Sequence, residues 1–188
     1  MKFPKILFFL FLLQIHDAQL DAYLDYKSPF HPTISGNGMV VSQNLESSKI
    51  GTMILESGGN AVDAAVAVGF SLTTTLPRAG NIGGGGFMLV YIKETEELFS
   101  IDYRSRSSLN SNLEDLFGSK SPAQIQDDDY DLTKYDYKAS AVPGTVYGLL
   151  EAHERFGDLP LEKVLQPVID QARNGIIVSY DLHNAIGS

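Results

Sequence analysis

Cysteine is absent from this 188-residue chain. Its absence excludes disulfide bonds, a thiolate nucleophile, and zinc or iron–sulfur sites that depend on cysteine ligands. A secreted protein without disulfides needs a core large enough to be stable without them. That requirement favours a chain that belongs to a larger protein.

Positive charge is sparse and scattered. Lys and Arg together number 14 against 23 Asp and Glu, which gives a formal net charge of −9. Phosphate backbones and anionic lipid surfaces attract clustered Lys and Arg, and no such cluster is present. We therefore expect neither nucleic acid nor a membrane surface as a partner.

Histidines also lack the spacing of a metal site. His16, His31, His153 and His183 are far apart in the sequence and form no His-x-x-x-His pair. Zinc binding is therefore not expected. His153 lies in a predicted helix near charged neighbours, and we expect it to be a half-exposed packing residue.

The apolar run Ile6–Leu13 is too short to cross a bilayer, since a membrane-spanning helix needs roughly 20 residues. Lys2 and Lys5 precede the run, and a small residue, Ala18 or Ala22, follows it at the spacing of a cleavage site. This pattern predicts a signal peptide over residues 1–18. The chain is then exported to the periplasm or the extracellular space, without membrane attachment after signal removal. A buried first strand is the alternative.

Hydrophobic spacing and turn residues predict an α+β chain without alternating βαβ units or internal repeats. Residues 105–139 are rich in Ser, Asn and Asp and are expected to form a surface excursion. Pro167 predicts a kink or a late start in the helix that contains it. The predicted strands are Met39–Val41, Phe87–Ile92, Leu98–Tyr103 and Ile176–Val178, and the predicted helices are 44–57, 61–72, 145–156 and 161–174.

The helix over 61–72 is apolar nearly all round, which is typical of a buried helix. Asn60 can cap its start, and Asp63 in the first turn suits the positive end of the helix dipole. The run Phe87–Ile92 is also almost continuously apolar. We expect that strand to be covered on both faces.

Glycines 83–86 do not form a phosphate-binding loop, because no Gly-Lys-Ser/Thr follows and a strand, not a helix, comes next. The run instead predicts a tight backbone crossing where no Cβ fits. The acidic stretch 127–131 lacks the spaced ligands and glycine of a calcium loop, so a solvated loop is the favoured interpretation. No Gly-x-Ser-x-Gly or Ser-x-x-Lys motif is present, and the residues alone identify no reaction.

Arg104 is the most informative single charge. It follows a predicted core strand and lies next to Asp102, a position where rigid scaffolds present functional groups. Its planar guanidinium matches a carboxylate in a bidentate contact. A surface ion pair with Asp102 or Asp115 is the alternative, and Arg78 and Arg106 have the same ambiguity.

Several motifs, in order over roughly residues 30–180, resemble those of γ-glutamyltranspeptidases. They are Gly58–Ala67 (GGNAVDAAVA), Pro77–Met88 (PRAGNIGGGGFM), Ile101–Arg104 (IDYR), His31–Pro32, Gly38–Ser42 (GMVVS), Val142–Val146 (VPGTV) with Gly148, Gln166–Pro167 and Ala172–Gly175 (ARNG).

The resemblance implies part of an αββα sandwich of the N-terminal-nucleophile hydrolase type. Residues 19–188 would be the N-terminal portion of the large subunit of a zymogen that cleaves itself into two subunits. The nucleophile would be the new N-terminal Thr of the small subunit, beyond Ser188. The resemblance thus implies no catalytic residue, cofactor or metal within this chain.

The implied reaction is transfer or hydrolysis of the γ-glutamyl group of glutathione or another γ-glutamyl donor. A γ-glutamyl-enzyme forms, and an amino acid, a dipeptide or water accepts the group. Arg104 matches the family arginine that grips the α-carboxylate of the donor. Many relatives continue Arg-Glu-x-Ala-Pro, whereas this chain has Ser105 and Arg106, which leaves open which arginine binds.

Two other functions fit the same resemblance. One is a related acylase acting on glutaryl or cephalosporin substrates. The other is a non-catalytic protein that retains the fold without a nucleophile, as a truncated remnant would.

Overall fold

The computed structural model describes residues 33–126 and 137–187. Residues 33–37 belong to a first compact unit, Met1–Asn37, and contain no helix or strand; all elements below belong to the second, Gly38–Ser188. Across the described ranges, no helix has the length and apolar character needed to span a membrane. The predicted signal peptide and the acidic stretch 127–131 lie outside the described residues.

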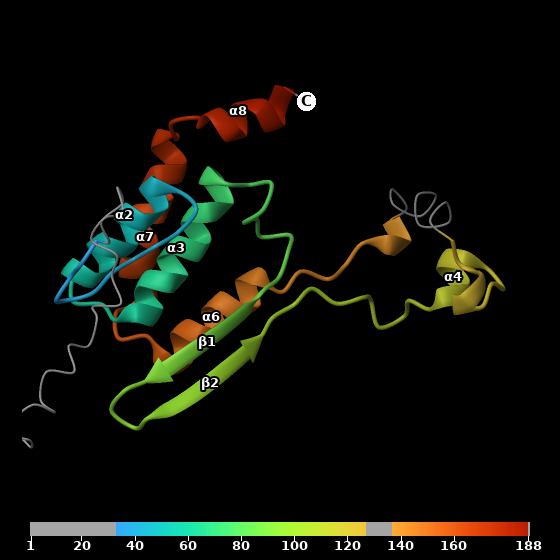
Figure 1. The fold of residues 1–188 in the computed structure, drawn as a ribbon, viewed down its shortest axis with the longest axis horizontal. Helices are drawn as coiled ribbons and strands as arrows, with labels where there is room; N and C mark the ends of the chain where they lie inside the picture. Colours follow the sequence, from blue (N-terminus) through green and yellow to red (C-terminus); the bar gives the residue numbers. More distant parts are fainter. Residues whose placement is uncertain (1–32, 127–136, 188) are drawn as a thin grey trace, which may run out of the picture. The chain divides into compact units, whose positions relative to one another are not determined.

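Three helices pack around one central helix. Helix α3 (Ala61–Thr75) contacts α2 (Leu45–Glu56), α6 (Thr145–Phe156) and α7 (Leu161–Asn174), as Figure 1 shows. Its side chains Val66 and Ala67 are fully buried. The prediction of a buried helix is confirmed.

Side-chain caps explain where α2 and α3 begin. The Asn44 side chain accepts from two backbone N–H groups of α2, and Asn60 does the same for α3. Asp63 completes a capping box by accepting from the Asn60 N–H at 2.9 Å. Helix α3 continues to Thr75, three residues past its predicted end, with the Thr73 and Thr74 hydroxyls donating to carbonyls one turn back.

A β-hairpin follows the glycine run. Strands β1 (Phe87–Ile92) and β2 (Glu97–Asp102) pair antiparallel, with Phe87 opposite Asp102, and run beside α6 (Figure 1). Val90 and Ile101 are buried in the same core as the helices. The hairpin is confirmed, with β2 shifted one residue toward the N-terminus.

The second face of this hairpin is uncovered among the described residues. Its exposed side chains are Phe87, Leu89, Tyr91 and Leu98. The expectation that the strand is covered on both faces is therefore wrong for this part of the chain. In a pleated strand alternate side chains point to opposite faces, so covering one face leaves the other in solvent.

Two predicted strands do not form. Residues 39–41 carry no strand pairing, and Val40 instead packs against Gly51 of α2. Ile177 and Val178 are exposed in an irregular segment before α8 (Tyr180–Gly187). Neither segment has a partner strand in the described ranges, and apolar residues alone do not supply one.

The remaining predictions for the second half mostly hold. Helix α6 begins at Thr145. Helix α7 begins at Leu161 and runs through Pro167, so the late start expected as one alternative is wrong; Val164 and Val168 are buried. The segment 105–139 contains the short helices α4 (Leu113–Phe117), η2 (Pro122–Gln124) and η3 (Tyr137–Ala139). None of these three short helices has a buried residue, as expected for a surface excursion.

Candidate functional site

Arg104 lies two residues beyond the end of β2. Its backbone N–H donates to Asp102 Oδ1 at 2.9 Å, and its side chain is exposed. Within residues 33–126 and 137–187, no carboxylate forms an ion pair with the Arg104 or Arg106 guanidinium. The proposed ion pair of Arg104 with Asp102 or Asp115 is therefore absent from the described part.

Three backbone segments, 84–86, 103–106 and 142–145, are hydrogen-bonded to one another at the strand end that carries Arg104. Tyr103 exchanges two hydrogen bonds with Gly86, extending the hairpin by one pair at 3.0 and 3.3 Å. Arg106 pairs in the same way with Val142, at 2.7 and 3.1 Å. The Gly84 carbonyl accepts from the backbone N–H groups at the start of α6, the shorter bond being 2.8 Å from Gly144. The strand end is thus fixed on both sides.

Glycine is required where these segments cross. A Cβ on Gly85 would overlap the Ser105 nitrogen, and a Cβ on Gly144 would overlap the Tyr103 carbonyl oxygen. Both obstacles are backbone atoms, which cannot move aside without breaking the hydrogen bonds around them. The sequence-based interpretation of the glycine run as a tight crossing is confirmed at Gly85.

The Tyr103 ring fills a slot that two further glycines leave open. A Cβ on Gly148 would overlap Tyr103 Cβ and Cγ, and a Cβ on Gly86 would lie 2.8 Å from its Cε2. Burial of the ring raises the pKa of the Tyr103 hydroxyl above its ordinary value. Sequence reasoning missed this slot, because Gly148 is about 45 residues away in the chain and only the fold brings it to Tyr103.

Arg78, the third candidate arginine, forms a surface ion pair. Its guanidinium donates to both carboxylate oxygens of Asp181, with NH2 at 2.8 and 2.9 Å. Both side chains are more than half exposed. The ion-pair alternative therefore holds for Arg78 and links the turn after α3 to α8.

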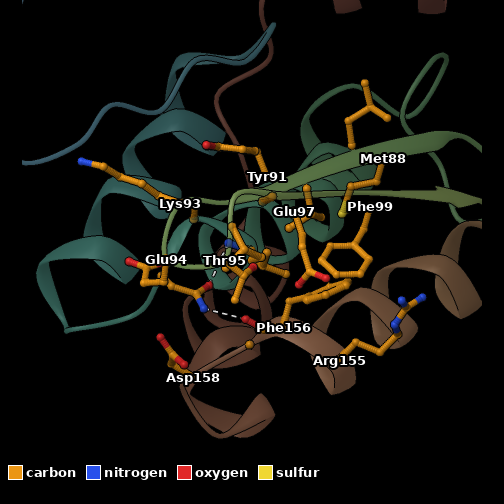
Figure 2. Close-up of a pocket in the computed structure, with 18 residues that line it drawn as sticks. Met88, Tyr91, Lys93, Glu94, Thr95, Glu97, Phe99, Arg155, Phe156 and Asp158 are labelled. Carbon is orange, nitrogen blue, oxygen red and sulfur yellow. Dashed lines mark hydrogen bonds between the residues drawn. The ribbon is translucent and has the colours of Figure 1, made fainter.

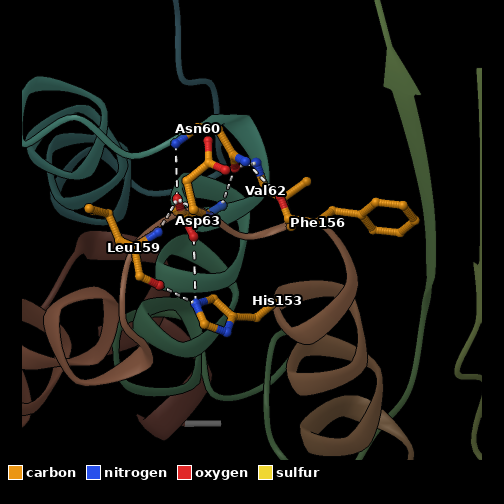
Figure 3. A network of polar contacts seen from close by, with 7 residues as sticks. Asn60, Val62, Asp63, His153, Phe156 and Leu159 are labelled. Atoms are coloured by element: carbon orange, nitrogen blue, oxygen red, sulfur yellow. Dashed lines mark hydrogen bonds and ion pairs between the residues drawn. The ribbon is translucent and has the colours of Figure 1, made fainter. Parts of the chain in front are cut away.

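A buried polar network joins the start of α3 to the connection between α6 and α7 (Figure 3). Asp63 is fully buried, and its Oδ2 accepts from the backbone N–H groups of Asn60, Asp158 and Leu159. Its Oδ1 accepts no hydrogen bond and lies 3.6 Å from Nε2 of His153. The same Nε2 lies 2.8 Å from the Leu159 carbonyl oxygen, which only accepts, so Nε2 carries the hydrogen.

The expectation that His153 is half exposed is wrong, because its side chain is only 14% exposed and packs in this network. The network holds two loops together, and its residues Asn60 and Asp158 also line a neighbouring groove. Among all the described residues, this network included, no three His, Asp or Glu residues come together in an arrangement able to hold a metal ion.

A groove of about 820 Å³ runs between the hairpin, the start of α3 and the end of α6 (Figure 2). Its wall includes the ring pair Phe99 and Phe156, whose centroids are 5.0 Å apart, with the Arg155 guanidinium 4.8 Å from the Phe156 centroid. Arg104 does not line it. This groove and the candidate binding arginine are therefore separate features.

A solved structure identifies the class of this fold. The γ-glutamyltranspeptidase from Pseudomonas nitroreducens complexed with L-DON matches with a TM-score of 0.70 and 36% identity, over 82% of this chain and 44% of that chain. The fold is thus α+β and forms part of an αββα sandwich of the N-terminal-nucleophile hydrolase type.

The family follows from the sequence. The γ-glutamyltranspeptidase family model matches residues 47–188, and the chain belongs to this family. The glutathione hydrolase proenzyme of Escherichia coli (strain K12) is 41% identical over 150 residues, which cover 80% of this chain and 25% of that protein. The resemblance inferred from the motifs is confirmed.

An acylase relative also matches. The acylase ACY 1 proenzyme of Pseudomonas sp. (strain V22) is 34% identical over 167 residues, covering 86% of this chain and 29% of that protein. The chain therefore spans about a quarter of the length of the curated relatives it matches.

Proposed function

We propose that this chain supplies the donor-carboxylate site of a γ-glutamyltransferase and glutathione hydrolase. The observation that carries the proposal is the environment of Arg104: a fixed backbone, an exposed guanidinium, and no carboxylate partner among the described residues. A guanidinium in this state is available for the α-carboxylate of glutathione or another γ-glutamyl compound. Membership of the family supports the substrate class.

The chemical step belongs to a part of the protein beyond Ser188. There, a Thr made N-terminal by self-cleavage attacks the γ-glutamyl amide carbon, and its own α-amino group takes the hydroxyl proton. The amide C–N bond breaks as the protonated α-amino group returns that proton to the leaving nitrogen, and the released amine is cysteinylglycine when glutathione is the donor. Water, an amino acid or a dipeptide then attacks the ester and releases the glutamyl group.

In this scheme residues 19–188 form the N-terminal portion of the large subunit, and the small subunit carries the nucleophile. The curated relatives are described as proenzymes, which supports that division. N-terminal sequencing of the smaller cleavage product of the full-length protein tests it. Thr is expected at the first position, and an uncleaved chain that still turns over substrate would refute the scheme.

Replacement of Arg104 tests the binding role in the full-length protein. We expect Arg104→Ala to lower kcat/KM for a γ-glutamyl anilide by roughly ten- to a hundredfold, mostly through KM, because charge-assisted hydrogen bonds to the carboxylate are lost. Arg104→Lys keeps the charge without the planar fork, and an intermediate loss is expected. Self-cleavage should proceed in both variants.

Arg106→Ala is the matched control, since it removes an exposed arginine two residues away. It should leave KM close to that of the unchanged protein. If Arg106→Ala raises KM and Arg104→Ala does not, the carboxylate site belongs to Arg106 instead.

The acylase relative supports a second function, amide hydrolysis by an acylase. The candidate substrates for that function are glutaryl and cephalosporin amides. Glutaryl and γ-glutamyl groups both end in a carboxylate and differ by the α-amino group, so Arg104 suits either donor. Parallel assays with γ-glutamyl and glutaryl anilides separate the two functions. A preference for the glutaryl donor would make the protein an acylase.

Export is also proposed, on the strength of Lys2, Lys5 and the apolar run Ile6–Leu13. The mature protein should be recovered outside the cytoplasm. Its N-terminus should lie just after Ala18 or Ala22. A cytoplasmic protein that retains Met1 would contradict this location.

A further inference from the structure

The residue before Arg104 is enclosed far more tightly than Arg104 itself. Both backbone polar groups of Tyr103 bond to Gly86, and its carbonyl faces Gly144 at a distance that admits no Cβ. Its ring is packed between Gly86 and Gly148. Three glycines from two separate segments thus surround one tyrosine.

Arg104, by contrast, has an exposed side chain and no ion pair in the described ranges. A free arginine side chain loses rotamer entropy when a ligand immobilises it. Nothing described around the guanidinium reduces that loss beforehand. Among the described residues, the Arg104 side chain can therefore be oriented for a ligand only through its backbone. That backbone is held in place by the hydrogen bonds of Tyr103.

We propose that Tyr103 is the positioning residue of the carboxylate site: its ring, seated between Gly86 and Gly148, sets the direction in which Arg104 leaves the strand end. This inference rests on the proposed function of Arg104. Bidentate pairing needs both guanidinium N–H groups aligned with one carboxylate, so a small rotation of the Tyr103 backbone weakens it. The glycines serve the site by leaving room for the ring.

Substitutions on both sides of the contact between the Tyr103 ring and Gly148 test this role in the full-length enzyme. Gly148→Ala forces the ring out of its slot, and Tyr103→Ala removes it. Both should raise KM for a γ-glutamyl anilide on the order of tenfold or more, with a much smaller change in kcat and with self-cleavage retained. Tyr103→Phe keeps the ring, and its KM should stay close to that of the unchanged protein.

Tyr147→Ala is the matched control, because Tyr147 neighbours Gly148 on α6 and its ring is largely exposed. This substitution also removes a tyrosine side chain, but it leaves the Tyr103 ring between Gly86 and Gly148 unchanged. Its KM should stay close to that of the unchanged protein, and a rise equal to that of Tyr103→Ala would overturn the inference.

A double-variant cycle separates positioning from general damage to the fold. If Tyr103 acts through Arg104, adding Tyr103→Ala to Arg104→Ala should raise KM little further, whereas independent effects would multiply. Multiplying effects overturn the inference. If Gly148→Ala does not fold, Tyr103→Ala and Tyr103→Phe carry the same comparison.

The outcomes also distinguish a failure of the Tyr103 inference from a failure of the proposed carboxylate binding by Arg104. If Arg104→Ala leaves KM unchanged, the carboxylate site itself is wrong. If Arg104→Ala raises KM but Tyr103→Ala and Gly148→Ala do not, the site stands and only the role of Tyr103 fails.

Discussion

Two charged side chains, Arg104 and Asp63, occupy opposite environments. Arg104 is exposed and has no ionic partner among the described residues, whereas Asp63 is fully buried and accepts three backbone hydrogen bonds. A buried carboxylate is stable only when its oxygens are hydrogen-bonded or paired. Asp63 is thus committed to structure, and Arg104 is available for a ligand.

Removal of the Asp63 carboxylate should destabilise the protein strongly. In Asp63→Ala the backbone N–H groups of Asn60, Asp158 and Leu159 lose their acceptor, and we expect the free energy of unfolding to fall by about 3 kcal/mol. Asp63→Asn keeps one oxygen acceptor and should cost less. Urea denaturation of the full-length protein measures both.

Asp158→Asn provides the comparison, since Asp158 is exposed and its contribution to the network is its backbone N–H. It should leave the unfolding midpoint nearly unchanged. If Asp63→Ala is as mild as Asp158→Asn, the network does not stabilise the fold.

At the scale of elements, α3 is joined to its neighbours by buried hydroxyl groups as well as apolar packing. Ser71 Oγ lies 2.7 Å from Ser47 Oγ of α2 and donates to Gln171 Oε1 of α7 at 2.7 Å. Thr75 Oγ1 lies 2.9 Å from the same Ser47 hydroxyl. These bonds join Ser71 of α3 to both neighbouring helices, α2 and α7.

Ser71→Ala should therefore destabilise the protein by about 1–2 kcal/mol, because Ser71 bridges α2 and α7. The loss should be visible as a lower midpoint in urea denaturation. Thr73→Ala is the matched change, since the Thr73 hydroxyl bonds only within its own helix, to the Phe70 carbonyl. Equal effects of the two substitutions would show that the bridge contributes nothing.

At the scale of the whole molecule, the open face of the hairpin dominates the expected behaviour. Phe87, Leu89, Tyr91 and Leu98 are exposed together on one side of β1 and β2, with Leu89 72% exposed. Contiguous exposed apolar surface of this kind promotes association. In the αββα sandwich such a face lies against a second sheet, which the described residues do not contain.

The 188-residue chain expressed by itself should aggregate or behave as a molten globule. We expect strong fluorescence of a hydrophobic dye and no sharp thermal transition. Leu89→Thr combined with Leu98→Thr should lower dye binding, whereas Leu109→Thr, a change at an isolated exposed leucine, should not. A cooperative melt with no dye binding would contradict this expectation.

Local signals determined much of the fold. The Asn44 and Asn60 caps, the apolar run of α3 and the polar tip of the hairpin lie within a few residues of what they control, so the elements were predictable from sequence. The strands expected at Met39–Val41 and Ile176–Val178 were wrong because a strand depends on a partner, which local sequence does not contain.

The sequence by itself determined the family, the glycine crossing and the candidacy of Arg104, because each is encoded in contiguous residues. Only the tertiary structure decided that Arg104 lacks an ion pair in the described ranges, that Arg78 has one, and that Tyr103 is seated between glycines. The physical reason is distance along the chain. Gly148 contacts Tyr103, and Asp181 pairs with Arg78, only after the helices pack. The local sequence around each residue does not predict these contacts.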